Sequence, residues 1–473
     1  MAGRPSSRVA AIVAPAGRAA ARAARRAEET RVLSVGLIVS APASASGKTV
    51  FTLALLRHLA RSGVAVASCK VGPDFIDPAY HAAASGRPCL NLDPWAMRAE
   101  TLAYLATTLA REAGLVIGEG VMGLFDGSGA EGKGSTADLA ALTGWPVMLV
   151  IDVSGQAASA AAVVRGFAGH RADVAVAGVV FNRVGGPGHE KVLRTAAAAA
   201  VPEVPVLGCL PRDSALALPE RHLGLVQASE KEDLEGFLDA AADLVAAHVD
   251  IAALTALARP CRIVTPRPQT VVPVPPLGQR IAVARDDAFA FSYPAVLDGW
   301  RAAGAEVSLF SPLEDQSPAA DADAVYLPGG YPELHGDRLA SNHNFLNGLG
   351  AAAARGAVIY GECGGYMVLG RGLIDRQGRR HAMAGLMALE TSFAQPRLHL
   401  GYRSVRLAAA GPLGATGAGF RGHEFHYASV AKRGPGAPLF TCADASGREL
   451  EPAGLIDGRV MGSFIHLVDR VGE

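Results

Sequence analysis

The sequence predicts an α/β protein made of two doubly wound domains. Three observations carry this prediction: short apolar runs alternate with helical stretches in two blocks, a Pro-rich stretch separates the blocks, and 473 residues exceed the usual size of one hydrophobic core. Near-continuous apolar strands that alternate with helices indicate parallel sheets covered on both faces. We therefore expect domains at 32–257 and 280–473, joined by a linker at 258–279.

The first block opens with strand, helix and strand. Residues 32–42 and 64–73 are apolar runs, and residues 48–63 between them carry apolar positions at helical spacing. Further apolar runs predict strands at 113–120, 145–154, 174–184 and 204–212. The block closes with one helix predicted over 231–258.

The second block follows a stretch that holds six prolines without periodicity, which is typical of an extended linker. Strands and helices are then expected at 280–287, 291–305, 306–312, 323–333 and 356–370. At the other end of the chain, residues 1–31 are rich in Arg, Ala and Ser. We interpret them as a disordered extension or the product of a misplaced start codon.

Composition excludes several classes of partner. The 44 basic and 44 acidic residues give no electrostatic reason to expect nucleic acid or an anionic membrane. No apolar run approaches the roughly 18 to 20 residues that cross a bilayer. The six cysteines lie far apart without a Cys-x-x-Cys pair, which fits a reducing compartment. We expect a cytoplasmic protein.

The motif Ser-Gly-Lys-Thr ends the loop between the first strand and helix. In a phosphate-binding loop, backbone N–H groups surround phosphate oxygens, Lys neutralises charge and Thr binds Mg²⁺. Gly47, Lys48 and Thr49 match these roles, although Pro42 stands where the first glycine of the motif belongs. The strand before and the helix after favour a nucleotide site over a chance match.

Charged residues follow the next strands at the carboxyl edge of the sheet, where ligands bind in open α/β sheets. Lys70, Asp74 and Asp77 follow one strand, and Glu119 ends another. A carboxylate beyond an apolar strand is a usual second Mg²⁺ ligand beside the Thr hydroxyl. These carboxylates and Lys70 could hold ATP, metal and an acidic substrate, with Thr49, Asp74 and Glu119 as the candidate metal ligands.

Two later strand ends offer contacts to the base or ribose of a nucleotide. Asn182 and Arg183 end one strand, and Arg212 and Asp213 follow another. The alternative, that they are ordinary surface loop residues, has equal weight.

Cys363 lies in Gly-Glu-Cys-Gly-Gly, on a sharp turn between a predicted strand and helix. This is the pattern of a nucleophile elbow, and the helix N-terminus is expected to lower the pKa of the thiol. A cysteine nucleophile needs a base, for which His466 is the candidate. The Gly-rich loop with Gly329 and Gly330 suits an oxyanion hole.

His423 and His426 form a His-x-x-His pattern, with His399 upstream. In a strand these two side chains point to opposite faces, so we favour substrate contact or core hydrogen bonding over metal binding.

An ATP site joined to a Cys/His site indicates glutamine-dependent amidation, and the chain resembles the cobyrinic acid a,c-diamide synthases of vitamin B12 biosynthesis. The resemblance covers residues 33–473 and rests on APASASGKT, KVGPDFIDPAYH, NLDPWAM, GEGVMGLFDG, FNRV, LPGGYPE, YGECGGYM and GHEFHYAS. It implies a P-loop domain like dethiobiotin synthetase fused to a flavodoxin-like class I glutamine amidotransferase domain. It also implies that ATP and Mg²⁺ activate the c and then the a acetate of the corrin as acyl phosphates, with L-glutamine as the amide donor.

Carried onto this chain, the resemblance makes Lys48 and Thr49 the phosphate and Mg²⁺ residues, and Cys363 and His466 the glutaminase pair. The usual loop of the family reads Ser-Gly-Ser-Gly-Lys-Thr, and Ala45 replaces one of its glycines. That change is small if the loop needs no positive φ there. Val468 stands where many class I amidotransferases carry an acidic residue, which leaves the backbone or Glu424 to orient His466.

Two rival interpretations remain at this point. Cobyric acid synthase shares both domains and amidates other side chains, and a regulatory P-loop ATPase could carry an inert amidotransferase-like domain. The macrocycle is either hydrogenobyrinic acid, which we favour, or its cobalt-containing counterpart, cobyrinic acid. The oligomeric state is open, with a homodimer as one option.

Overall fold

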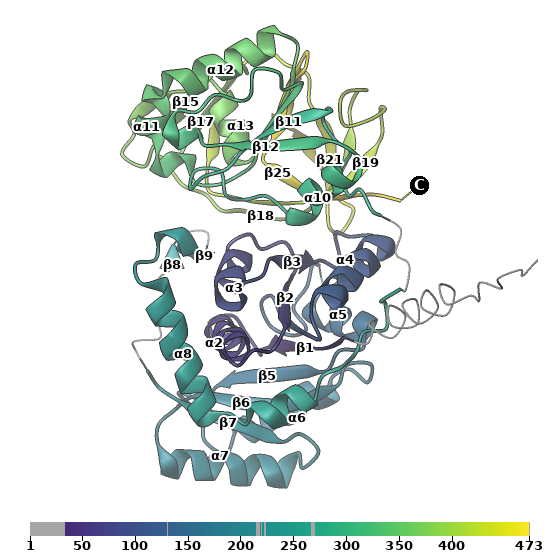
Figure 1. The fold of residues 1–473 in the computed structure, drawn as a ribbon, viewed down its shortest axis with the longest axis vertical. Coiled ribbons are helices and arrows are strands. Elements are labelled where there is room, and N and C mark those ends of the chain that lie inside the picture. Colours follow the sequence, from purple (N-terminus) through teal and green to yellow (C-terminus); the bar gives the residue numbers. More distant parts are fainter. Residues whose placement is uncertain are drawn as a thin grey trace, which may run out of the picture.

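The computed structural model describes residues 34–129, 131–213, 218, 220–221, 224–265 and 270–472. The interpretation of residues 1–31 as an extension therefore lies outside the described residues. Within them the chain forms two α/β halves, which are stacked one above the other in Figure 1. No helix in the described ranges has the length and apolar content to span a membrane.

The N-terminal half is built on a parallel sheet of order β3-β2-β4-β1-β5-β6-β7. In that order the strands are Cys89–Leu92, Val66–Val71, Leu115–Glu119, Val35–Ser40, Val147–Asp152, Val176–Val184 and Val206–Pro211. A short strand, β10 (Arg259–Pro260), lies in the stretch expected as a linker and pairs antiparallel with the start of β1. The exact boundary between the domains stays a prediction.

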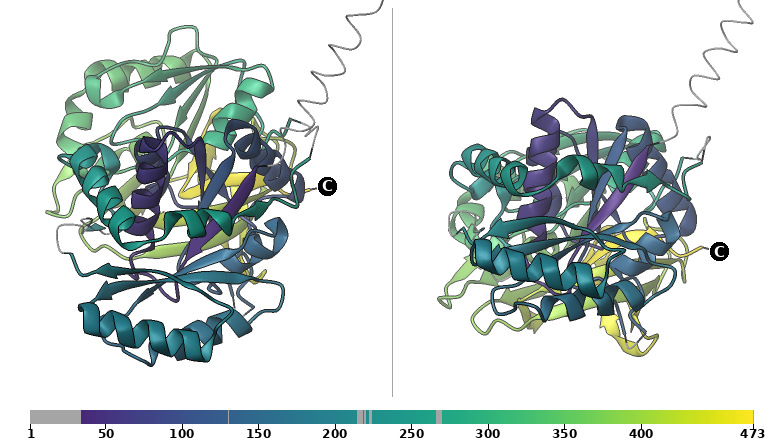
Figure 2. Two further views of the ribbon diagram at one scale, coloured as in Figure 1. Left: turned by 60° about the horizontal axis from the view of Figure 1, so that its bottom comes forward. Right: turned by 90° about the horizontal axis from the view of Figure 1, so that it is seen from below.

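Helices cover both faces of this sheet. Leu37 and Val39 of β1 share one buried cluster with side chains of α2, α3 and α8, whereas Ile38 belongs to a second cluster with α4, α5, α6 and α7. The helices are α2 (Lys48–Arg61), α3 (Asp77–Ser85), α4 (Ala99–Glu112), α5 (Thr136–Thr143), α6 (Ala160–Gly169), α7 (Pro187–Ala200) and α8 (Leu234–His248). Figure 2 shows α2 and α8 side by side, joined by Arg57 and Asp239 at 2.7 Å. The sheet is therefore doubly wound, as predicted.

The helix predicted over 231–258 is wrong in one respect, because the structure divides it into α8 and a short α9 (Ile251–Ala256). Val249 leaves the helix to bridge Gly208 on β7. Asp250 then starts α9, because its Oδ1 accepts the backbone N–H of Ala253 at 2.9 Å. A local cap and a tertiary strand contact thus interrupt an otherwise continuous helical pattern.

The C-terminal half has a sheet of order β12-β11-β13-β14-β24-β23, parallel except for β23. The strands are Glu306–Phe310, Arg280–Ala284, Ala324–Leu327, Val358–Glu362, Val460–Ser463 and Leu455–Asp457. Its helices are α10 (Pro294–Ala302), α11 (Gly336–Ser341), α12 (His343–Ala354) and α13 (Gly364–Leu369). Cys363 thus lies between β14 and α13, where the sequence predicts a strand-to-helix turn.

Two smaller sheets, absent from the sequence prediction, complete this half. One has the order β16-β15-β17-β20: Arg380–Ala382, Gly372–Ile374, Leu389–Ser392 and Ser429–Arg433. The other has the order β22-β21-β18-β19-β25: Glu449–Ala453, Phe440–Asp444, His399–Leu407, Gly419–His426 and Ile465–Arg470. The second sheet positions His466 because β25 pairs with β19, where His423 is the direct partner of His466.

The two halves meet along a polar and aromatic interface. Arg98 contacts Asp469 through its backbone N–H at 2.9 Å and its guanidinium at 3.0 Å. Tyr402 donates its hydroxyl to Asp93 at 3.0 Å and stacks on Trp95 at 4.4 Å. In Figure 1, β18 and α10 lie at this boundary. Because Asp93, Trp95 and Arg98 follow the carboxyl end of β3, the carboxyl edge of the first sheet faces the C-terminal half.

Candidate active site

The loop between β1 and α2 packs tightly against the side chain of Asn182. Gly47 has a left-handed φ of 93°, and a Cβ there would collide with Nδ2 of Asn182. That Nδ2 donates to the carbonyl of Ser46 at 3.0 Å, and Lys48 Nζ lies 3.4 Å from the carbonyl of Ala43. The structure therefore brings Asn182 against the loop that contains Gly47 and Lys48.

The loop also needs a positive φ at Ala45, where the angle is 61°. The condition under which the Ala45 replacement would be a small change, a loop without positive φ at this position, is therefore not met. The left-handed region costs a residue with a Cβ about 1–2 kcal/mol. The neighbouring hydrogen bond from Asn182 to Ser46 helps to hold the strained loop.

A buried network joins α2 to β2, α3 and β4. Thr49 donates its hydroxyl to Oε1 of Glu119 at 2.6 Å, and Lys70 Nζ lies 2.8 Å from the same oxygen. Lys70 also pairs with Asp77, and the other oxygen of Glu119 lies 2.6 Å from Nε2 of His81. Four predicted residues thus meet at one point. The sequence analysis missed His81, although it lies one helical turn after Asp77 on the same face of α3.

Charge complementarity fixes the protonation of this network. Burial disfavours the ammonium of Lys70, but Asp77 and Glu119 outweigh it and raise the pKa of Lys70 above its ordinary value. Burial would also raise the pKa of Glu119, but Lys70 and His81 outweigh it and lower that pKa. The network therefore holds an ammonium between two carboxyl groups.

Asp74 lies beside this network without joining it. Its Oδ1 accepts the backbone N–H groups of Ile76 at 2.8 Å and Asp77 at 3.0 Å, so it orders the turn that leads into α3. A pocket of ≈ 510 Å³ is lined by Asp74 together with Lys48, Thr49, Lys70, Asp77 and Glu119. The predicted metal set Thr49, Asp74 and Glu119 therefore shares one pocket, with only Thr49 and Glu119 in direct contact.

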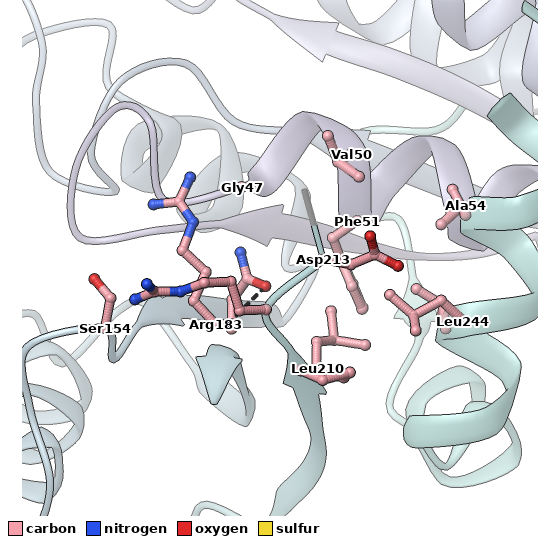
Figure 3. A pocket seen from close by; sticks show the side chains of 14 residues that line it. Gly47, Val50, Phe51, Ala54, Ser154, Arg183, Leu210, Asp213 and Leu244 are labelled. Carbon is pink, nitrogen blue, oxygen red and sulfur yellow. Dashed lines mark hydrogen bonds between the residues drawn. The ribbon is translucent and has the colours of Figure 1, made fainter. Parts of the chain in front are cut away.

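A second pocket, of ≈ 460 Å³, continues from the phosphate loop (Figure 3). It shares Gly47, Val50 and Arg183 with the first pocket. Its other lining residues include the remaining polar candidates and several apolar side chains, namely Asn182, Arg212, Asp213, Phe51, Leu210 and Leu244. The two predicted strand ends therefore meet in a cavity with an apolar wall, which suits a heterocyclic base next to a phosphate site.

Cys363 has the backbone of a strained elbow. Its φ is 47° and its ψ is −105°, and its N–H donates to the carbonyl of Ser463 at 2.8 Å. Strained non-glycine conformations of this kind cluster at active sites. A side chain at Gly365 would collide with the carbonyl of Leu327, so the turn requires small neighbours.

His466 and the Gly-rich loop converge on Cys363. A Cβ on Gly329 would collide with Cε1 of His466 and lie 3.1 Å from Cβ of Cys363. The backbone nitrogen of Gly330 lies 3.0 Å from the position that a Cβ on Gly364 would take. The structure thus brings all four predicted residues of the amidotransferase site together at the N-terminus of α13.

The prediction of a lowered thiol pKa is wrong for this state of the protein. Burial raises the pKa of Cys363 well above its ordinary value, and the carboxyl groups of Glu333 and Glu424 add to the effect. Burial likewise lowers the pKa of His466 to about 3. The short helix α13 does not offset the loss of solvent, so the resting pair is a neutral thiol and a neutral imidazole.

The carboxyl group nearest to His466 is Glu362, which the sequence analysis missed. Its Oε2 lies 3.7 Å from Nδ1 of His466, and its oxygens accept from Tyr326 at 2.7 Å and Tyr360 at 2.9 Å. Burial raises the pKa of Glu362 to about 7. The sequence held a signal for Glu362, because a Glu that ends an apolar strand directly before the candidate nucleophile is expected to be buried close to that nucleophile.

Glu424, which the sequence analysis offered beside the backbone as a residue that orients His466, has other partners. It lies 2.9 Å from Nε2 of His426 and 2.7 Å from Nε of Arg403. Among the described residues, His399, Glu424 and His426 form one group whose ligand atoms, within 4.8 Å of one another, could hold a metal. Because the guanidinium of Arg403 already neutralises Glu424, we assign no metal to the group.

The class of the protein follows from this pairing of a nucleotide site with a Cys/His site. A family model described as a CobQ/CobB/MinD/ParA nucleotide binding domain matches residues 37–226. A second, described as a CobB/CobQ-like glutamine amidotransferase domain, matches residues 280–470. The chain is therefore a nucleotide-binding glutamine amidotransferase.

Relatives that are similar to this chain over nearly its whole length identify the family within this class. Proteins named hydrogenobyrinate a,c-diamide synthase from Brucella abortus biovar 1 (strain 9-941) and Rhizobium meliloti (strain 1021) are 55% and 52% identical. The first alignment covers 93% of this chain and the second 92%, with 99% of each relative. The protein of that name from Rhodobacter capsulatus is 53% identical over 92% of this chain and 98% of its own. The chain belongs to the hydrogenobyrinate a,c-diamide synthase family, which favours the main interpretation over both rivals.

Proposed function

We propose that this protein converts the c and a acetate side chains of hydrogenobyrinic acid to amides, with ATP as the energy source and glutamine as the amide donor. The observation that carries the proposal is the presence, in one chain, of the Thr49–Glu119 contact behind a phosphate loop and the Cys363–His466 site behind an elbow. Neither site alone would make an amide from a carboxylate and glutamine. Together they supply an activated carboxyl group and ammonia.

The nucleotide half would hold ATP and Mg²⁺. Gly47 leaves no room for a side chain where the backbone must approach phosphate. The hydroxyl of Thr49 donates to Glu119 at 2.6 Å, so one cation that replaced this hydrogen bond would find both oxygens beside it. Lys48 would neutralise phosphate charge, and Mg²⁺ would reduce the negative charge that repels an attacking carboxylate. Lys70 and Asp77 would position the substrate carboxylate, and Asn182 and Arg183 would contact the nucleoside.

The macrocycle would lie between the halves. A pocket of ≈ 320 Å³ is lined by Asp74 from the nucleotide half and by Tyr402 and Phe425 from the amidotransferase half. Met122 and Leu400 also line it, with 42% and 55% of their surface exposed. Exposed apolar side chains in this pocket suit the apolar faces of such a ring.

In the amidotransferase half, His466 would take the proton of Cys363 as sulfur attacks the carboxamide carbon of glutamine. The N–H groups of the Gly329–Gly330 loop would stabilise the oxyanion, and protonated His466 would return the proton to the departing ammonia. Water then cleaves the thioester and releases glutamate. The ammonia attacks the acyl phosphate, which forms the amide and releases phosphate.

Mass spectrometry of the macrocycle tests this proposal. The purified protein is incubated with MgATP, glutamine and either hydrogenobyrinic acid or cobyrinic acid. We expect two carboxyl groups to become amides only when ATP is present, with hydrogenobyrinic acid as the better substrate because the relatives carry its name. ATP hydrolysis without a change in the mass of either macrocycle would contradict the proposal.

A further inference from the structure

The imidazole of His466 lacks the hydrogen bonds that usually orient a catalytic base. Neither Nδ1 nor Nε2 has a hydrogen-bond partner among the described residues, and both atoms are buried. The nearest carboxyl oxygen, on Glu362, lies 3.7 Å from Nδ1, which is too far for a hydrogen bond. In Cys/His sites a third residue normally holds the base by hydrogen bonding. Another kind of contact must fix the ring here.

That contact comes from the other half of the chain. The ring of Phe75 lies 4.5 Å from the imidazole of His466, centroid to centroid, at an interplanar angle of 44°. Phe75 also packs on Phe291 at 5.4 Å and on Tyr293 at 4.4 Å. The hydroxyl of Tyr293 donates to the carbonyl of Pro73 at 3.0 Å. The loop before α3 is thus held inside the amidotransferase half.

The same loop leads directly into the nucleotide site. Asp74 accepts the backbone N–H of Asp77 at 3.0 Å, and Asp77 pairs with Lys70. Lys70 contacts Glu119 at 2.8 Å, and Glu119 accepts the hydroxyl of Thr49. An unbroken series of contacts therefore runs from the phosphate loop to the residue that precedes Phe75.

We propose that Phe75 is a positioning residue for His466, and that it makes glutamine hydrolysis depend on the state of the nucleotide site. The proposal rests on the role of His466 as base under the proposed function. A bound Mg-nucleotide that engages Thr49 and Glu119 changes their contacts with Lys70 and Asp77, and so changes the start of α3. Because Phe75 lies on that segment, the imidazole turns toward its productive orientation only when the synthetase site is filled.

The test compares the full-length protein with Phe75→Ala and Phe75→Tyr. Glutamate release is measured with and without MgATP and hydrogenobyrinic acid, and amidation is measured separately with ammonium in place of glutamine. We expect the two ligands to stimulate glutamate release in the wild type and in Phe75→Tyr, which keeps the ring. In Phe75→Ala the stimulation is lost and glutamine-dependent turnover falls about 10²-fold, the cost of a misplaced catalytic group. Ammonium-supported amidation remains at saturating macrocycle, with a higher KM for the macrocycle because Phe75 also lines the pocket proposed for the ring.

A matched control removes another contact at the same interface. Tyr293→Phe deletes the hydrogen bond to Pro73 but keeps the ring beside Phe75, so stimulation should survive. A further readout is the pH profile of glutamate release. Because Phe75→Ala admits water to His466, desolvation lowers its pKa less, and the acid limb of the profile moves to higher pH.

Three outcomes would count against these ideas, and they are distinguishable. Phe75→Ala with wild-type stimulation would overturn the inference. Loss of ammonium-supported amidation in both Phe75 variants would also overturn it, because Phe75 would then act in the synthetase site. Glutamine hydrolysis by a Cys363→Ala variant would instead defeat the proposed function itself.

Discussion

At the scale of single residues, the amidotransferase site rests in an uncharged state. Cys363 and His466 are both buried, and burial raises the pKa of the thiol while it lowers that of the imidazole. An ion pair of the Cys363 thiolate and the His466 imidazolium would cost desolvation energy, and without a ligand no contact in the site offsets that cost. Under the proposed function, proton transfer to His466 therefore has to accompany the attack of Cys363 on glutamine.

The thiol of Cys363 should consequently react slowly with iodoacetamide at neutral pH. Alkylation requires the thiolate, and a raised pKa keeps its population small until the pH exceeds about 9. Peptide mass spectrometry of the free protein, sampled across pH, separates Cys363 from the other five cysteines. Fast alkylation that reaches its plateau below neutral pH would show that the thiolate is already present, contrary to this description.

Glu362 should make stability depend on pH. The unfolded chain releases this proton near the ordinary Glu pKa of about 4.3, whereas the folded carboxyl group retains it up to about 7. Between these values unfolding releases a proton, so stability falls as pH rises and levels off above the window. The lowered pKa of His466 makes stability rise with pH instead, but this contribution is the same in the wild type and in the Glu362→Gln variant used to test the prediction.

Thermal unfolding of the wild type and of Glu362→Gln, each near pH 5 and pH 8, measures this effect. We expect the midpoint temperature of the wild type to fall more between pH 5 and pH 8 than that of Glu362→Gln, since the glutamine side chain has no proton to release. An identical change in both proteins would mean that Glu362 is ionised in the folded state.

At the scale of elements, the turn between β1 and α2 combines a left-handed Gly47 with a left-handed Ala45. Such a turn directs its N–H groups inward only if no side chain intrudes and a neighbour fixes the loop. Asn182, at the end of β6, supplies that support by its bond to Ser46. The proposed nucleotide site is therefore built from the ends of two strands, β1 and β6.

Gly47→Ala should weaken ATP binding at least about 10-fold, because the added Cβ collides with Asn182 at a φ that side chains avoid. Isothermal titration with ATP and Mg²⁺ measures the loss. Gly63→Ala is the matched control, since Gly63 has a φ of 76° but nothing within 4 Å of its Cβ position. Equal affinity in Gly47→Ala and Gly63→Ala would mean that the loop does not hold the nucleotide.

At the scale of the whole molecule, much of the nucleotide site was predictable from the sequence. Lys70 and Glu119 end neighbouring strands of one parallel sheet, and the carboxyl ends of such strands meet at one edge. Thr49 begins the helix that follows a third strand of the same sheet. Strand order and polarity alone therefore bring these residues together.

Other features depend on packing that no local pattern encodes. The contact between Glu362 and His466 requires β14 to lie beside β24, which precedes β25. The contact between Phe75 and His466 requires the docking of two domains. The loop that contains Ala45 is held through Ser46 by a hydrogen bond from Asn182, a residue more than a hundred positions away.

The central claim is that two sites in one chain perform separate parts of one amidation, and Cys363→Ala tests it most directly. The variant is supplied with MgATP, hydrogenobyrinic acid and either glutamine or ammonium, and amide formation is followed by mass spectrometry. We expect no product with glutamine but amides with ammonium, whereas Glu119→Gln should form none with either donor. Amidation of the Cys363→Ala variant with glutamine, or its failure with both donors, would contradict the account.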